Sequence, residues 1–137
     1  MVLGGVYMFN NTVTLVTYDE KTNSIIKSVL TNVYLERKVG VTLSESGENT
    51  ASNAVLYVPL NKNCFSEKYY EPKKYEALNL DEKANAITFK KGQLIVLGKS
   101  VEGKNMNEIE NLNDNVFRIL DVSTYDDVLP HIEITCK

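Results

Sequence analysis

Apolar and polar residues alternate with a period of two through most of this chain. Residues 12–18 combine β-branched and aromatic side chains in the pattern of a strand. The polar residues 19–24 then favour a turn, and residues 25–39 form a second β region whose alternation breaks at 30–33. Such a break predicts a bulge that bends the strand. A bent strand pair favours a curled sheet or small barrel over a flat sheet.

The same alternation predicts five further strands, at residues 54–58, 86–89, 93–98, 116–122 and 131–136. One short helix is predicted over 71–78, with Pro72 in its first turn. Residues 105–112 suit either a helical turn or an irregular connection, and 123–129 a loop. About seven short strands separated by polar turns predict a mostly-β fold, either a small barrel or a sandwich.

The longest stretch of low hydrophobicity is residues 40–53. Connections of more than about twelve residues in a compact domain are usually functional or disordered. Val41 and Leu43 alternate with polar residues, as expected for a hairpin arm that pairs with the sheet edge of a neighbour. A polar loop without regular structure explains the composition equally well, so both interpretations stay open.

Size and composition indicate one folded domain. The chain has 137 residues, 43% of them apolar and 24% charged, which is typical of a globular protein. We expect an N-terminal extension at 1–7 and a single β-rich domain at 8–137. The net charge of −3 gives no broad basic field for nucleic acid or an acidic membrane. The chain contains no run of about 18 apolar residues, so the sequence predicts no membrane-spanning helix.

The residues that carry chemistry are sparse. His131 is the only histidine, which excludes zinc sites built on several histidines, and neither Cys64 nor Cys136 lies in a Cys-x-x-Cys pair. Both cysteines are expected to be free thiols. Neither a phosphate-binding glycine motif nor calcium-loop spacing occurs, and Asp126-Asp127 is typical of a solvated turn. We therefore expect no catalytic residue, no cofactor and no metal, and hence not an enzyme.

Several segments, in order along the chain, resemble small phage and prophage proteins of Firmicutes that serve as minor capsid or head–tail connector (neck, head-closure) proteins. The resemblance runs from about residue 8 to the end as many weak matches. It is carried by residues 11–15, 29–33, 54–59, 87–93, 114–119 and 129–134. Residues 1–7 lie outside this pattern.

The resemblance implies a structural virion protein without catalytic residues. It would form a homo-oligomeric ring in the neck, between portal or adaptor and tail-terminator proteins, with DNA only as passing cargo and no membrane partner. Assembly would take place in the host bacterial cytoplasm. The residues expected at the subunit interface surround the presumed arm: Arg37, Lys38, Val41, Leu43, Glu45 and Glu48. The alternative function is a small-ligand or carbohydrate-binding β-barrel module, because eight tyrosines could line a pocket.

Overall fold

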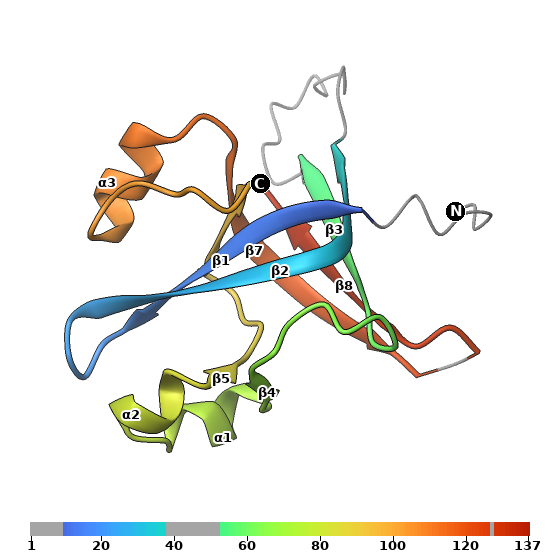
Figure 1. The fold of residues 1–137 in the computed structure, drawn as a ribbon, viewed down its shortest axis with the longest axis horizontal. Coiled ribbons are helices and arrows are strands. Elements are labelled where there is room, and N and C mark those ends of the chain that lie inside the picture. Colours follow the sequence, from blue (N-terminus) through green and yellow to red (C-terminus); the bar gives the residue numbers. More distant parts are fainter. Residues whose placement is uncertain (1–9, 38–52, 127) are drawn as a thin grey trace, which may run out of the picture.

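The computed structural model describes residues 10–37, 53–126 and 128–137. Within these ranges the chain forms eight strands and three short helices (Figure 1). The strands are β1 (Asn11–Asp19), β2 (Ser24–Arg37), β3 (Ala54–Pro59), β4 (Lys68–Tyr69), β5 (Ala86–Ile87), β6 (Leu94–Leu97), β7 (Val116–Tyr125) and β8 (His131–Cys136). The helices are α1 (Pro72–Glu76), α2 (Leu80–Lys83) and α3 (Met106–Leu112).

Six strands close an antiparallel barrel in the order β1-β2-β3-β8-β7-β6, which confirms the mostly-β fold and decides for the barrel over the sandwich. The barrel consists of two sheets that share β2 and β7. Sheet A holds the first part of β2, then β1, β6 and the start of β7. Sheet B holds the last part of β2, then β3, β8 and the rest of β7.

Two irregularities allow β2 and β7 to serve both sheets. In β2, Thr31 and Asn32 lie opposite the single residue Thr12, since Asn11 pairs with Val33 and Val13 with Leu30. Asn32 has a φ of 58°, a left-handed conformation that asparagine tolerates better than most residues. The bulge predicted at 30–33 is thus confirmed. In β7 the register shifts between Ile119 and Asp121, where the strand turns from sheet A into sheet B.

The barrel interior is filled with aliphatic side chains from both sheets. Residues 60–93, here called the insert, join β3 to β6 and pass across one end of the barrel (Figure 1). Cys64, Ile87 and Phe89 of the insert are buried in the same apolar cluster as the strands. The insert also covers the bulge in β2, because the backbone N–H of Thr31 donates to the carbonyl of Cys64 at 2.9 Å. The insert therefore closes this end of the core.

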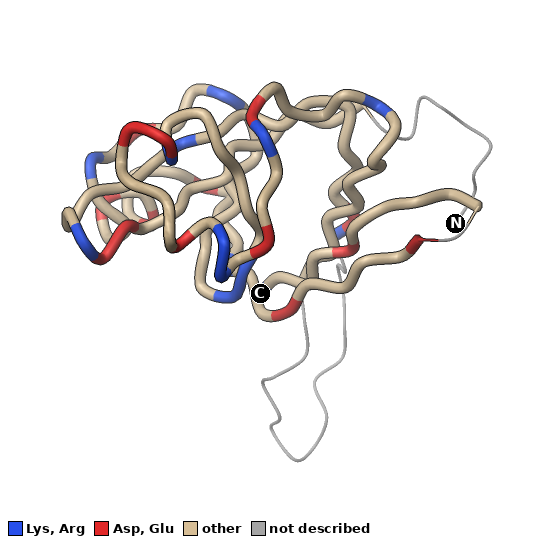
Figure 2. Tube along the Cα trace, turned by 90° about the horizontal axis from the view of Figure 1, so that it is seen from below, with Lys and Arg blue, Asp and Glu red and all other residues tan. Residues whose placement is uncertain are grey.

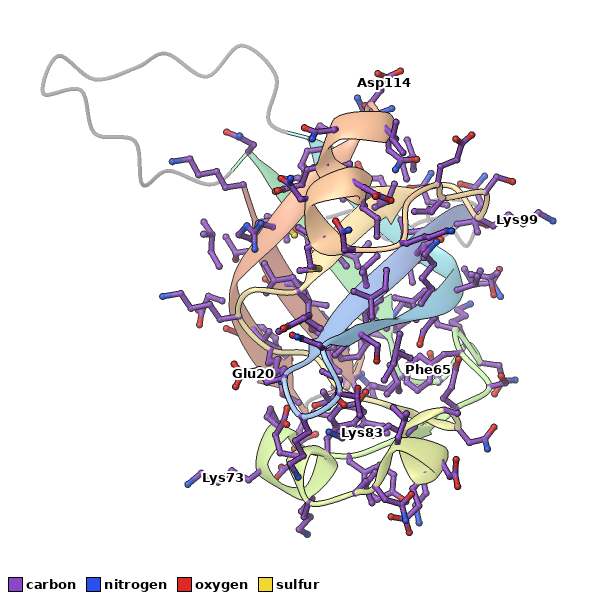
Figure 3. The ribbon with its side chains drawn as sticks, turned by 90° about the vertical axis from the view of Figure 1, so that its left-hand side faces the viewer. Glu20, Phe65, Lys73, Lys83, Lys99 and Asp114 are labelled. Atoms are coloured by element: carbon purple, nitrogen blue, oxygen red, sulfur yellow. The ribbon has the colours of Figure 1, made fainter. Side chains whose placement is uncertain are left out.

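A buried lysine fixes the insert to the barrel. Lys83 in α2 is 1% exposed, and its Nζ lies 2.7 Å from Oδ1 of Asp19 at the end of β1. The same ammonium lies 3.6 Å from Glu76 and 5.2 Å from the ring centre of Tyr75, both in α1. Lys83 thus lies between the helices of the insert and the turn after β1 (Figure 3). Its hydrogen bond is the main reason why the pKa of Asp19 lies below its ordinary value.

Several element boundaries differ from the sequence prediction. The predicted helix over 71–78 is α1, but α2 follows it with a capping box at Asn79, which was not predicted. Residues 106–112 form the helix α3. The loop predicted over 123–129 was wrong in its first part, because β7 continues to Tyr125, which pairs with His131. In the described part of the chain no helix is long and apolar enough to cross a membrane.

Candidate functional site

Sheet B presents an outer face on which most side chains are half-buried or exposed. Strict alternation places one set of side chains in the barrel core and the other set on this face, as the burial pattern of β8 illustrates. Sheet register then assigns eleven residues to the outer face of sheet B. They are Tyr34, Glu36, Val55, Tyr57, Pro59, Asp121, Ser123, Tyr125, His131, Glu133 and Thr135.

Four aromatic rings form a row across the four strands of this face. Tyr34 and Tyr57 stack with ring centres 5.8 Å apart, and Tyr57 lies 6.4 Å from His131. His131 stacks on Tyr125 at 4.9 Å, with an angle of 7° between the two rings. Stacked rings present their flat faces to one another. The flat surfaces of this row are therefore largely occupied by neighbouring rings.

Two carboxylates form hydrogen bonds with polar atoms of the aromatic row. The hydroxyl of Tyr57 donates to Oε1 of Glu36 at 3.1 Å. Burial first, and then this hydrogen bond, raise the pKa of Tyr57 to about 12, so the phenol stays a donor. Nε2 of His131 lies 2.9 Å from Oε2 of Glu133, and its Nδ1 lies 2.8 Å from the carbonyl oxygen of Leu129. The imidazolium form of His131 can donate to both acceptors at once.

The charge on this face has one sign. Glu36, Asp121 and Glu133 lie on it, whereas none of its eleven residues is lysine or arginine. Residues 119–136, which include most of β7 and all of β8, contain no lysine or arginine either. Figure 2 shows most of the basic residues on the side of the molecule that carries the helices. The outer face of sheet B is thus aromatic and acidic.

The outer side of sheet A is built differently. Val16, Leu94 and Val96 point outward from this sheet and pack against Ile109 of α3, which is fully buried. Val101 and Met106 extend the same apolar cluster. The chain therefore covers the outer side of sheet A with its own residues 98–115.

A cleft of about 530 Å³ opens beside α3 on the outer side of sheet A. Its lining includes three basic side chains, Lys90, Lys91 and Arg118, and one carboxylate, Glu20. Lys90 forms an ion pair with Glu76, and Arg118 donates to Glu110 at 2.8 Å. Lys91 is exposed. We call this feature the basic cleft.

The expected interface residues fall mainly outside the described chain. Arg37 is the last residue of β2, is exposed, and pairs with Ala54 at the edge of sheet B, next to Glu36. The presumed arm at 40–53 and the other expected interface residues, namely Lys38, Val41, Leu43, Glu45 and Glu48, lie outside the described residues. The structure therefore brings Arg37 to the rim of the aromatic and acidic face and leaves the rest of that prediction open.

The cysteines and the histidine do not form a reactive site. Cys136 points into the core and is fully buried, whereas His131 points outward on the same strand. Burial raises the pKa of Cys64 to about 11 and that of Cys136 to about 12, which keeps both thiols protonated. Both are free, as predicted. Among the described residues no three His, Cys, Asp or Glu side chains gather in a way that could hold a metal ion.

Residues 68–75 combine three lysines with three tyrosines, a mixture that can also bind nucleic acid. In this structure Tyr69 and Tyr75 pack within the protein instead. Tyr75 is 2% exposed and lies under the ammonium of Lys83. Tyr69 stacks on Phe89 with ring centres 6.0 Å apart. These contacts attach the insert to the core and leave fewer rings for stacking on nucleic-acid bases.

Fold and face together define a small closed β-barrel in which α3 covers the outer side of one sheet and most outward side chains of the other sheet are half-buried or exposed. The chain belongs to a family of unknown function (DUF6751), whose family model matches residues 8–137. Among the curated proteins and the solved structures, none matches the chain.

Proposed function

We propose that this protein is a structural subunit of the neck of a tailed bacteriophage or prophage. In this proposal it forms a homo-oligomeric ring that joins the portal to the tail and lets DNA pass. The resemblance of its ordered segments to head–tail connector proteins supports this function, and the proposed location is the virion, after assembly in the host cytoplasm. The single observation that carries the proposal furthest is the aromatic and acidic outer face of sheet B.

The tyrosines of this face are typical of a surface that contacts another protein. Tyrosine is enriched at protein–protein interfaces, where its ring supplies contact area and its hydroxyl a hydrogen bond. Tyr34, Tyr57 and Tyr125 offer these groups on a rigid sheet. The net charge of −3 also fits a ring that conducts DNA, because a basic channel would bind the phosphates as they pass.

A small-ligand or carbohydrate-binding module is the alternative. The basic cleft favours it, because pockets for small ligands have volumes of roughly 300–1,000 Å³. Two observations weigh against it. The aromatic row turns its flat surfaces toward its own rings rather than toward a sugar, and Tyr18 is the only aromatic side chain among the residues lining the cleft. We therefore favour the neck subunit.

The test is to locate the protein in assembled particles. The source bacterium is induced, particles are sedimented from the lysate, and the protein is located by antibody labelling in electron micrographs. We expect label at the junction of head and tail. Clean particles, with all of the protein left in the supernatant, would contradict the proposal and favour the ligand-binding module.

A further inference from the structure

The outer face of sheet B is poorly suited to pair with itself. A symmetric contact between two copies through this face would bring Glu36, Asp121 and Glu133 of both copies together. No lysine or arginine on the face could compensate them, and like charges brought together at an interface weaken association. A second copy must therefore offer a different surface to this face.

The basic cleft lies on the opposite side of the barrel. Its Lys90 and Arg118 are already paired with Glu76 and Glu110, whereas Lys91 is exposed and supplies the complementary charge. Tyr18 and Arg118 of its lining point outward from sheet A, since they pair with Ile25 and Leu94 on that side. Sheets A and B face each other across the core, so the cleft and the acidic face point in opposite directions. Contacts between two different surfaces on opposite sides of a subunit produce rings when the rotation closes.

We infer that copies of this chain associate head-to-tail, with the outer face of sheet B of one copy against the basic cleft of the next. This inference rests on the proposed function, which requires a ring, and it names the two surfaces that build that ring. Lys91 and Arg118 are the groups of the cleft that meet the carboxylates. Lys91 and Asp121 are both exposed, and Arg118 forms an exposed pair with Glu110 and donates to the carbonyl of Gly92 at 3.2 Å.

The hairpin between β7 and β8 extends the contact beyond the sheet. One side of a stable interface contains about 20–30 residues, which is more than the eleven of the sheet face. Val128 and Leu129 at the hairpin are 92% and 56% exposed, and Leu60, whose N–H donates to Pro130, is 43% exposed. These apolar side chains adjoin the aromatic row at Tyr125 and supply additional contact area.

Charge exchange between the two surfaces tests the inference. Association of the full-length chain is measured by sedimentation velocity at low and high salt. We expect Asp121→Lys and Lys91→Glu each to weaken association by about tenfold, the scale of one exchanged charge pair, and added salt to weaken the wild type. A mixture of the two variants should associate like the wild type, because every contact then joins opposite charges. Lys99→Glu is the matched control and should have no effect.

Three results would overturn the head-to-tail contact: a wild type that stays monomeric at all concentrations, variants that associate normally, or a mixture that does not recover. The electron micrographs test a separate point. Label at the neck combined with any of these results would leave the proposed function standing and remove only the head-to-tail contact. If the two charge variants weaken association and their mixture restores it, but the particles carry no label, the head-to-tail contact stands and the proposed function is contradicted.

Discussion

The two sheets of this barrel share two strands but differ in the side chains on their outer sides and in what covers those side chains. On sheet A, the outward side chains Val16, Leu94 and Val96 are apolar, and residues 98–115 with α3 cover them. On sheet B, nine of the eleven outward side chains are aromatic, acidic or hydroxylic, while Val55 and Pro59 are apolar and buried. The apolar outer side of sheet A is therefore buried within the same chain. An amphipathic face whose outward side chains are mostly half-buried or exposed is available to another protein.

The difference is present in the burial patterns of β1 and β8, although β3 of sheet B is buried at five of its six positions. In β1, five consecutive residues from Val13 to Thr17 are buried, as expected for a strand covered on both sides. In β8, buried and half-buried residues alternate without exception, as expected for a strand covered on one side. The predictions below are ordered from the largest expected effect to the smallest.

The largest effect should follow from removing the ammonium of Lys83. The variant Lys83→Met leaves Asp19 buried without its partner, and breaking a buried ion pair in this way costs about 3–5 kcal/mol. We expect denaturant unfolding to show a loss of this size. The double variant Asp19→Leu/Lys83→Met should recover much of it, because two apolar groups leave no unpaired charge. A single variant as stable as the wild type would show that Lys83 does not fix the insert.

The cover of sheet A depends on Ile109. Truncation by Ile109→Ala should lower the free energy of unfolding by about 2–5 kcal/mol, because this side chain is fully buried between α3 and the sheet. The matched variant Leu112→Ala, on an exposed residue of the same helix, should change it by less than about 0.5 kcal/mol. Equal effects at the two positions would mean that α3 is not the cover described here.

The outer face of sheet B should respond differently to truncation. Tyr125→Ala removes one stacked ring, which is worth about 0.5–1.5 kcal/mol of stability. We expect its association with other copies, followed by sedimentation velocity, to fall far more than its stability. A variant that loses stability but associates normally would make the aromatic row a structural feature only.

The smallest effect is a dependence on pH at the insert. Lys83 holds the pKa of Asp19 below its ordinary 3.8, so the native state binds this proton less tightly than the unfolded chain. The stabilisation is complete above pH 3.8 and is lost as the pH falls through the lower native pKa. Thermal unfolding between pH 6 and pH 2.5 should therefore decline more steeply for the wild type than for Asp19→Asn/Lys83→Met. Parallel curves would contradict the pairing.

Much of the fold could be predicted from the sequence because alternation and turn chemistry are local signals. Seven of the eight strands, the bulge in β2 and the first helix are predicted in this way, whereas β4 is not. The sequence does not decide between a helical turn and an irregular connection at α3, because only Ile109 of this short helix is buried and its apolar pattern is therefore weak. The end of β7 was missed, because Tyr125 becomes part of a strand only through its pairing with His131.

The candidate face could not be predicted from local patterns. Tyr34, Tyr57, His131 and Tyr125 become neighbours only once β2, β3, β8 and β7 pair in their observed register. The pairing of β3 with β8 joins segments more than seventy residues apart, such as Tyr57 and Glu133. The spacing of the tyrosines in the sequence does not predict this pairing. The sequence instead predicts an interface around the presumed arm. Of the residues predicted there, Arg37 lies at the edge of sheet B.

The central claim is that another protein covers the outer face of sheet B in the assembled particle. Ser123→Cys places a thiol on this face, and the two natural thiols are buried with raised pKa values, so maleimide labelling reports mainly the new position. We predict rapid labelling in the dilute protein and strong protection in sedimented particles, whereas Lys99→Cys should label rapidly in both. Equal labelling of Ser123→Cys in the dilute protein and in particles would contradict the claim.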